Sequence, residues 1–209
     1  MTETEGNERH IAILLYEGVE VLDFSGPFEV LTTAKRVAAK RGETFPYVPL
    51  LIAASREPVV ARAGYCVLPD HDYDSCPALA CLLVPGGVHE PHLDNQPLIA
   101  WVKRRAAEVE LLASVCTGAF LLAEAGVVSG RHMTTHWEDI TDFRTRYKDV
   151  EIIENVRWVE DGPLISSAGI SAGIDMALQM VARLGSDVLA EQTARQMDFD
   201  WKRTGVKLS

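Results

Sequence analysis

Cys116 is the residue whose surroundings most clearly indicate chemistry. It lies between a short apolar run, Glu110–Val115, and a segment, Gly118–Ala125, whose apolar residues recur at helical spacing. A cysteine between a buried strand and the first turn of a helix occupies a sharp elbow that holds its sulfur out of the sheet. Free N–H groups and partial positive charge at the helix N-terminus favour the thiolate, so we expect a pKa below the usual value of about 8.5. A small buried hydrophobic residue is the alternative interpretation of this cysteine.

Asp23 lies in a loop just before a predicted helix, a few residues ahead of Pro27. One interpretation is an N-cap, for which aspartate is favoured. The other is a carboxyl group beside the Cys116 sulfur, which burial and a neighbouring thiolate would keep protonated by raising its pKa. Such a carboxyl group can donate a hydrogen bond to sulfur and act as a general acid.

Gly86 and Gly87 follow a predicted strand and are compatible with a plain turn. The functional interpretation is an oxyanion hole, because glycines let the backbone approach a substrate closely. The N–H group of Thr117, the residue after the candidate nucleophile, would be the second donor.

The six histidines leave two further interpretations open. A Cys–His pair would indicate acyl transfer or proteolysis, but no histidine adjoins Cys116, and sequence alone does not show whether His136 approaches it in space. His89 and His92 flank Glu90, but no further ligand spacing supports a metal site. We therefore expect no metal.

The elements that would position these residues alternate between strand and helix. Continuous apolar runs are typical of strands buried on both faces of a parallel sheet, with helices covering both faces. The expected strands are residues 11–15, 49–54, 80–84, 110–115, 152–159 and 164–167, with a hairpin over 59–68. The first expected helix begins near residue 23. The others span about 96–107, 118–125, 138–147, 170–184 and 187–197, and a polar tail follows the last one. Parallel sheets bind ligands beyond the carboxyl ends of their strands, where three loops containing the candidate residues converge.

Length and composition indicate one soluble α/β domain. The 209 residues suit a single domain spanning 1–209, with a core at about 9–185 and a C-terminal helix and tail at 186–209. The net charge of −10 argues against nucleic acid and anionic membranes as partners. Four scattered cysteines without a C-x-x-C pair fit a reducing compartment, and the acidic N-terminus lacks the features of a signal peptide. We therefore expect a cytoplasmic protein.

Five motifs in order resemble the ThiJ/PfpI superfamily, which has the class I glutamine-amidotransferase-like fold. They are Leu22–Val30, Val84–Gly87, Ser114–Ala123, Thr134–Trp137 and Ser166–Asp175. The resemblance runs from about residue 11 to 184 and implies a flavodoxin-like three-layer α/β sandwich with a nucleophile elbow, usually in a homodimer. It also implies that His136, Gly169 and Ile170 belong to the pocket.

Within the superfamily the chain is most similar to isocyanide hydratases and to the amidase-like domain of AraC-type regulators. The similarity implies Cys116 as nucleophile, Thr117 as its catalytic neighbour and Asp23 as the acidic partner. The protease branch has histidine directly after the cysteine, whereas this chain has Thr117. The regulator branch adds a helix-turn-helix domain of roughly 100 residues, for which a chain ending at Ser209 leaves no room.

The similarity implies a cofactor-free lyase that hydrates a small-molecule isocyanide, R–N≡C, to an N-substituted formamide. A ligand or redox sensor that kept the fold without the activity is the alternative, because regulator-type sequences share Asp23, Cys116 and Thr117. A glyoxalase- or deglycase-like activity fits less well, because those relatives usually have glutamate where Asp23 stands.

Overall fold

An eight-stranded sheet forms the centre of the protein, of which the computed structural model describes residues 8–208. Its strand order is β12-β10-β11-β7-β6-β1-β2-β5, and every neighbouring pair is parallel except β10 and β11. The strands of the sheet are β1 (Arg9–Leu14), β2 (Tyr47–Ala53), β5 (His71–Asp72), β6 (Leu79–Val84), β7 (Leu111–Val115), β10 (Trp158–Asp161), β11 (Leu164–Ser167) and β12 (Gly205–Leu208). The central order β2-β1-β6-β7-β11 is the 2-1-3-4-5 order of flavodoxin-like folds.

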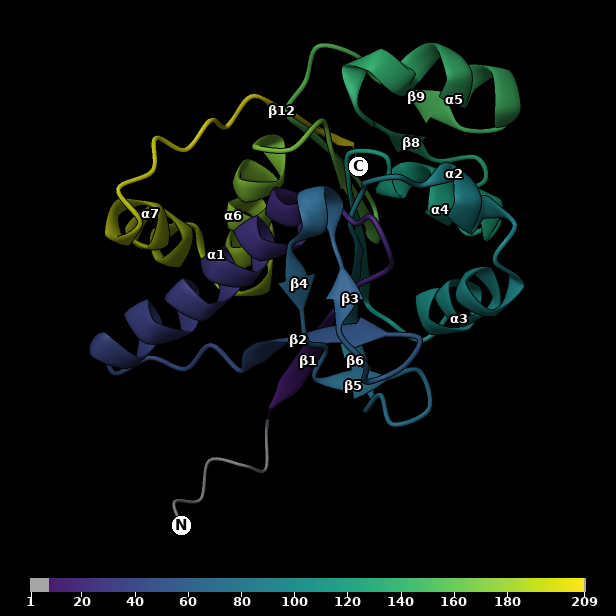
Figure 1. Ribbon diagram of the computed structural model, residues 1–209. Coiled ribbons are helices and arrows are strands. Elements are labelled where there is room, and N and C mark those ends of the chain that lie inside the picture. Colours follow the sequence, from purple (N-terminus) through teal and green to yellow (C-terminus); the bar gives the residue numbers. More distant parts are fainter. Residues whose placement is uncertain (1–7, 209) are drawn as a thin grey trace.

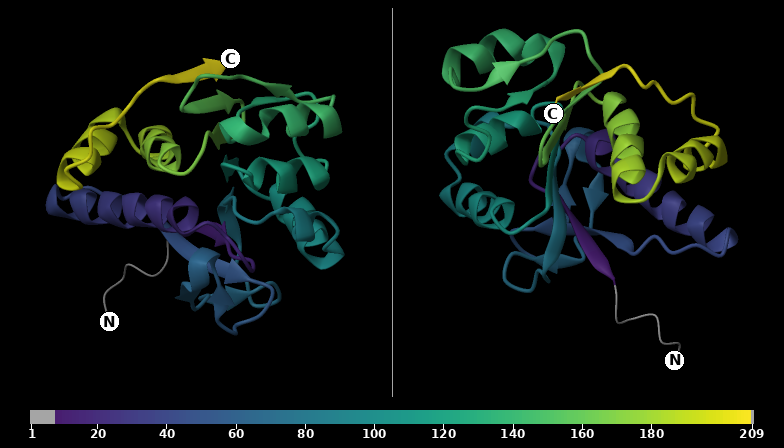
Figure 2. Two further views of the ribbon diagram at one scale, coloured as in Figure 1. Left: turned by 45° about the horizontal axis from the view of Figure 1, so that its top comes forward. Right: turned by 180° about the vertical axis from the view of Figure 1, so that it is seen from behind.

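Helices cover both faces of this sheet (Figures 1 and 2). Helices α1, α6 and α7 pack together on one face, and α2, α3 and α4 pack together on the other. Their bounds are α1 (Val21–Lys40), α2 (Glu90–Leu93), α3 (Gln96–Ala106), α4 (Gly118–Glu124), α5 (Ile140–Arg146), α6 (Ala172–Leu184) and α7 (Asp187–Gln196). The expected three-layer α/β sandwich with a mainly parallel sheet is confirmed.

The apolar runs became strands because both of their faces are covered. The side chains of Ile11–Leu14 are completely buried, as are those of Cys81–Val84. Without water on either face, alternation of polar and apolar residues is not required, and β-branched and aliphatic side chains fill the space between the helical layers. The ends of β1, β6 and β7 consequently lie side by side at one edge of the sheet.

Two small sheets lie outside the central one. The expected hairpin forms from β3 (Val59–Val60) and β4 (Cys66–Val67), which are antiparallel. Strands β8 (His132–Met133) and β9 (Glu151–Ile152) pair in parallel beside α5. The prediction of one strand over 152–159 is therefore wrong: β9 and β10 are separate, and Asn155 between them has a left-handed φ of 60°.

The expected helix over 138–147 also begins differently. A 3₁₀ turn, Trp137–Asp139, precedes α5, so the regular helix starts only at Ile140. The segment after α7, expected as a polar tail, returns to the sheet and adds β12 beside β10. On the way, the backbone N–H of Lys202 donates to Asp175 Oδ1 at 2.7 Å, and the Trp201 indole donates to the Asp175 carbonyl oxygen at 3.2 Å.

Among residues 8–208, no helix has the length and apolar character needed to cross a membrane.

Candidate active site

The elbow at Cys116 is confirmed. Strand β7 ends at Val115, Cys116 has a left-handed φ of 55°, and α4 starts at Gly118. This conformation is strained for a residue with a Cβ, so surrounding contacts must hold it. The Cys116 N–H donates to the Ser167 carbonyl oxygen at 3.2 Å, and the Thr135 hydroxyl donates to the Cys116 carbonyl oxygen at 2.9 Å.

Gly118 explains how α4 comes so close to the neighbouring strand. A Cβ at this position would lie 2.0 Å from the Val84 carbonyl oxygen and 2.8 Å from that of Pro85. Only glycine therefore lets the first turn of α4 sit on the end of β6. The close approach places the loop of Pro85, Gly86 and Gly87 directly beside Thr117.

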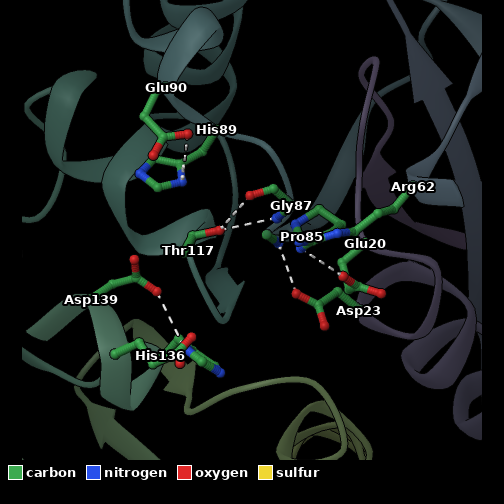
Figure 3. A network of polar contacts seen from close by, with 12 residues as sticks. Glu20, Asp23, Arg62, Pro85, Gly87, His89, Glu90, Thr117, His136 and Asp139 are labelled. Atoms are coloured by element: carbon green, nitrogen blue, oxygen red, sulfur yellow. Dashed lines mark hydrogen bonds and ion pairs between the residues drawn. The ribbon is translucent and has the colours of Figure 1, made fainter.

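Asp23 lies in the first turn of α1 and is completely buried. Its Oδ2 accepts a hydrogen bond from the Gly86 N–H at 3.0 Å, whereas Oδ1 has no hydrogen-bond partner among the described residues (Figure 3). The N-cap interpretation is wrong, because the helix begins at Val21 and its N-cap position is Glu20, without a side-chain cap. Asp23 is instead held in place by the loop after β6.

The pKa of Asp23 is raised to about 7, chiefly by burial. The Gly86 hydrogen bond offsets part of this effect. The Cys116 side chain also interacts with the carboxyl group and lowers its pKa, although it does not reach hydrogen-bond geometry. The expected rise in the pKa of Asp23 through burial is confirmed, whereas the neighbouring cysteine, which was expected to raise this pKa further, lowers it. The raised pKa allows the carboxyl group to exchange protons near neutral pH.

The expected fall in the pKa of Cys116 is wrong. Burial first, and then the negative charge of Asp23, raise the pKa of this thiol to about 12. Backbone hydrogen bonds from Thr117 and Ile170 favour the thiolate but do not compensate. The resting form is therefore a thiol beside a carboxyl group, and Asp23 is positioned to receive the thiol proton when the sulfur attacks.

Gly86 and Gly87 contact Asp23 and Thr117. Their N–H groups, predicted to form an oxyanion hole, already donate hydrogen bonds within the protein. The Gly86 N–H donates to Asp23, and the Gly87 N–H donates to Thr117 Oγ1 at 3.0 Å. The Thr117 hydroxyl in turn donates to the Gly87 carbonyl oxygen at 3.1 Å (Figure 3). A Cβ on Gly86 would lie 2.6 Å from the Thr117 nitrogen and 2.9 Å from Asp23 Oδ2, so glycine leaves open the space between the two groups.

A cavity of about 510 Å³ opens in front of Cys116 and Thr117. Gly87, Cys116, Thr117, His136 and Ile170 all line it. A second cavity of about 580 Å³ adjoins the first, because it shares the two lining residues His136 and Ile170, and Gly169 lines it as well. The predicted site residues therefore lie together, although Asp23 and Gly86 line neither cavity: Asp23 is connected to the site through its hydrogen bond from Gly86 and its effect on the Cys116 thiol.

Sequence reasoning missed two features of the cavity wall. Asp139 Oδ2 lies 3.3 Å from His136 Nδ1. The sequence signals this pair only by its spacing, because residues three apart lie on the same side of a helical turn. His89 is buried with its ring 4.3 Å from that of Phe120, and its Nε2 has no hydrogen-bond partner among the described residues. Residues 8–208 contain no group of three His, Cys, Asp or Glu side chains arranged to hold a metal ion.

Comparison with known proteins places this chain in a family. The family model DJ-1/PfpI matches residues 9–183. Isonitrile hydratase of Pseudomonas putida is 30% identical over 190 residues, which cover 90% of this chain and 78% of that protein. The HTH-type transcriptional regulator CdhR of Pseudomonas aeruginosa is 31% identical over 183 residues, but these span 88% of this chain and only 53% of the regulator.

Solved structures give the same result. A ThiJ/PfpI family protein from Pseudomonas syringae superimposes with a TM-score of 0.79 and 28% identity, covering 92% of this chain and 76% of that one. DJ-1beta of Drosophila melanogaster has the same fold, with a TM-score of 0.78 at 18% identity over 93% of this chain and all of the other. The chain belongs to the DJ-1/PfpI family.

Proposed function

We propose that this protein is a cysteine-dependent hydratase that converts an isocyanide to an N-substituted formamide. The observation that carries the proposal is the Cys116 thiol beside Asp23, a buried carboxyl group whose pKa is raised to about 7. Hydration of R–N≡C needs a soft nucleophile and a group that can both take and return a proton near neutral pH. Similarity to the isonitrile hydratase supports this reaction over others of the family.

In the first step the sulfur attacks the terminal carbon of the isocyanide. Asp23 accepts the thiol proton and delivers it to that carbon, which gives the thioimidate R–N=CH–S–Cys116. Water then adds to the same carbon, one of its protons passes to nitrogen, and the C–S bond breaks with its electron pair returning to sulfur. The hydroxyl proton returns to the pair of Cys116 and Asp23, and R–NH–CHO leaves. Every step uses groups of this chain, water and substrate.

Thr117 and the two glycines would shape the site. The Thr117 N–H faces the sulfur, and the exchange of hydrogen bonds between Thr117 and Gly87 fixes the rim of the cavity. The oxyanion-type role of these N–H groups remains a prediction. It would require the Gly87 N–H to leave Thr117 Oγ1 when substrate charge develops.

A sensor is the second candidate. It is favoured by the identity to the regulator. A sensor needs one binding or oxidation event, whereas a hydratase must regenerate its cysteine. The remaining expectations are a homodimer, a small-molecule partner rather than nucleic acid or membrane, and a location in the reducing cytoplasm, in keeping with four free cysteines.

The decisive experiment counts formamide molecules per Cys116 when the protein is incubated with excess isocyanide. Many per chain, abolished in Cys116→Ala, support the hydratase. At most one per chain, with or without a stable adduct, rejects it in favour of the sensor.

A further inference from the structure

His136 is held in one orientation on the wall of the cavity. Its Nδ1 lies 3.3 Å from Asp139 Oδ2 and 3.8 Å from Glu138 Oε2, and only 16% of the side chain is exposed. Gly169 lies directly against the ring, since a Cβ there would be 2.0 Å from Cδ2. A carboxylate near Nδ1 favours the tautomer with hydrogen at Nδ1 and the lone pair at Nε2. No described residue makes a hydrogen bond to Nε2, so this atom keeps its basic lone pair.

Cys116 and His136 line the same cavity without a hydrogen bond between them. Both belong to the wall of the 510 Å³ space, and no hydrogen bond joins them among the described residues. Gly169 beside the ring is followed by Ile170, whose backbone faces the Cys116 sulfur. The imidazole and the reacting sulfur therefore belong to one cavity that can admit a substrate.

Asp23 and His136 come from different parts of the chain and lie apart in the site (Figure 3). Asp23, on α1, is completely buried and hydrogen-bonded to Gly86, so it faces the thiol and not the open space. His136 lies on the turn before α5 and is partly accessible from the cavity. Water that reaches a group bound to the sulfur must enter through this open side.

Formation and hydrolysis of the thioimidate therefore require proton transfer at different places in the site. Forming the thioimidate needs proton transfer at sulfur, where Asp23 lies. Hydrolysing it needs a base for the incoming water and an acid for the imidate nitrogen, both on the open side. A neutral imidazole supplies both in sequence, because it can take a proton from water at Nε2 and pass it to the nitrogen.

We propose that His136, oriented by Asp139, activates the water that hydrolyses the thioimidate on Cys116. The inference rests on the proposed hydratase function and divides its two steps between two groups. Nε2 takes one proton as the water oxygen bonds to the thioimidate carbon, and the same proton passes to nitrogen as the C=N bond becomes a single bond. The hydroxyl proton then returns to the Cys116–Asp23 pair as the C–S bond breaks.

The test separates the half-reactions with benzyl isocyanide as the probe. Intact-mass spectrometry measures the adduct on Cys116, and chromatography measures N-benzylformamide. In His136→Gln we expect the adduct to form at a rate within threefold of wild type, to accumulate to one per chain, and to release formamide about 100-fold more slowly. Asp139→Asn should also accumulate the adduct, with release slowed about tenfold.

Matched controls come from the same segment. His132→Gln changes a histidine that pairs with Glu151 and Asp161 outside the cavity, and Asp142→Asn changes an exposed carboxylate that pairs with Arg146. Both should turn over within twofold of wild type. Unfolding curves verify that each variant is folded. If His136→Gln does not fold, accumulation of the adduct in Asp139→Asn tests the proposal instead.

Contrary outcomes are distinct for the two proposals. Equal loss of adduct formation and release in His136→Gln, or no loss of either, overturns the role of His136 while the hydratase stands. A wild-type protein that neither forms an adduct nor consumes isocyanide rejects the proposed function itself. A wild-type protein that stops at the adduct rejects the hydrolysis role and identifies the sensor.

Discussion

The backbone N–H of Gly86 donates to Asp23 Oδ2 across 3.0 Å and so joins the loop after β6 to the first turn of α1. The bond fixes one carboxyl oxygen and leaves Oδ1 as the oxygen that can exchange a proton with the neighbouring thiol. Burial of the carboxyl group raises its pKa towards neutrality, because the protein replaces the water that would stabilise the charge. The buried site beside the loop after β6 therefore determines both the position of the Asp23 carboxyl group and its affinity for a proton.

Asp23→Asn should stabilise the protein at alkaline pH while abolishing turnover. The folded-state pKa of Asp23 is raised, so its favourable contribution is complete below the unfolded pKa near 4 and is lost as pH rises through about 7. At pH 8 the wild type carries a buried charge that asparagine removes, and we expect a gain in unfolding free energy on the order of 1–4 kcal/mol. This difference in unfolding free energy between variant and wild type should shrink below pH 5. Urea unfolding of both proteins at pH 5 and pH 8 measures it. A loss of stability at both values would contradict this account.

The same variant should change the reactivity of Cys116. The charge of Asp23 is the second cause of the raised thiol pKa, so its removal lowers that pKa. Alkylation of Cys116 by iodoacetamide at pH 8 should be several-fold faster in Asp23→Asn than in the wild type. Equal rates would mean that burial alone sets the pKa of the thiol.

In the wild type, Cys66 should be the first cysteine to be alkylated near neutral pH. Cys66 is exposed, whereas the other three thiols are buried and have raised pKa values, about 12 for Cys81 and Cys116. Only the thiolate reacts, so we expect Cys116 to react at least tenfold more slowly than Cys66. Peptide mass spectrometry after limited labelling at pH 7.5 gives the order, and Cys116 labelled first would restore the thiolate predicted from the sequence.

The sequence predicts the strands and the elbow because these follow from local patterns. Apolar runs identify the buried strands, and a cysteine followed by a glycine at a strand–helix junction identifies the elbow. The pKa of Cys116 could not be predicted in the same way. It depends on how deeply the packed fold buries the sulfur and on the distance to Asp23, which is 93 positions away in the chain.

Two errors in the predicted elements have a similar cause. Strand β12 forms only because β10 offers its edge, and Gly205 lets the chain pass over the Trp158 ring, where a Cβ would lie 2.1 Å from its atoms. The apolar residues between 152 and 159 suggested one strand, but Asn155 turns the chain so that its two ends join different sheets. Pairing of distant segments decides both cases, and no local window of the sequence contains that information.

Gly86→Ala should reduce activity strongly, with a smaller effect on folding. The new methyl group would lie 2.6 Å from the Thr117 nitrogen, 2.7 Å from its hydroxyl oxygen and 2.9 Å from Asp23 Oδ2. These contacts are too close, so the loop must move and the bond to Asp23 lengthen. We expect turnover to fall at least 100-fold, the range typical of a misplaced proton-transfer group. Steady-state rates together with thermal unfolding test this, and an active variant would show that the loop can move without disturbing the site.

Substrate charge should affect turnover through the mouth of the cavity. Glu20 and Glu90 on its wall carry negative charge, and Arg62 supplies one positive charge that is already paired with Glu20 at 3.2 Å. An anionic substrate meets unfavourable potential on entry, whereas a neutral one does not. We expect kcat/KM for isocyanoacetate to be about tenfold lower than for its methyl ester, equivalent to about 1.4 kcal/mol. The difference should narrow in 0.5 M salt, which screens exposed charges, and in Glu90→Gln. A preference for the anion would mean that Arg62 leaves Glu20 to bind substrate, and Arg62→Gln would then remove that preference.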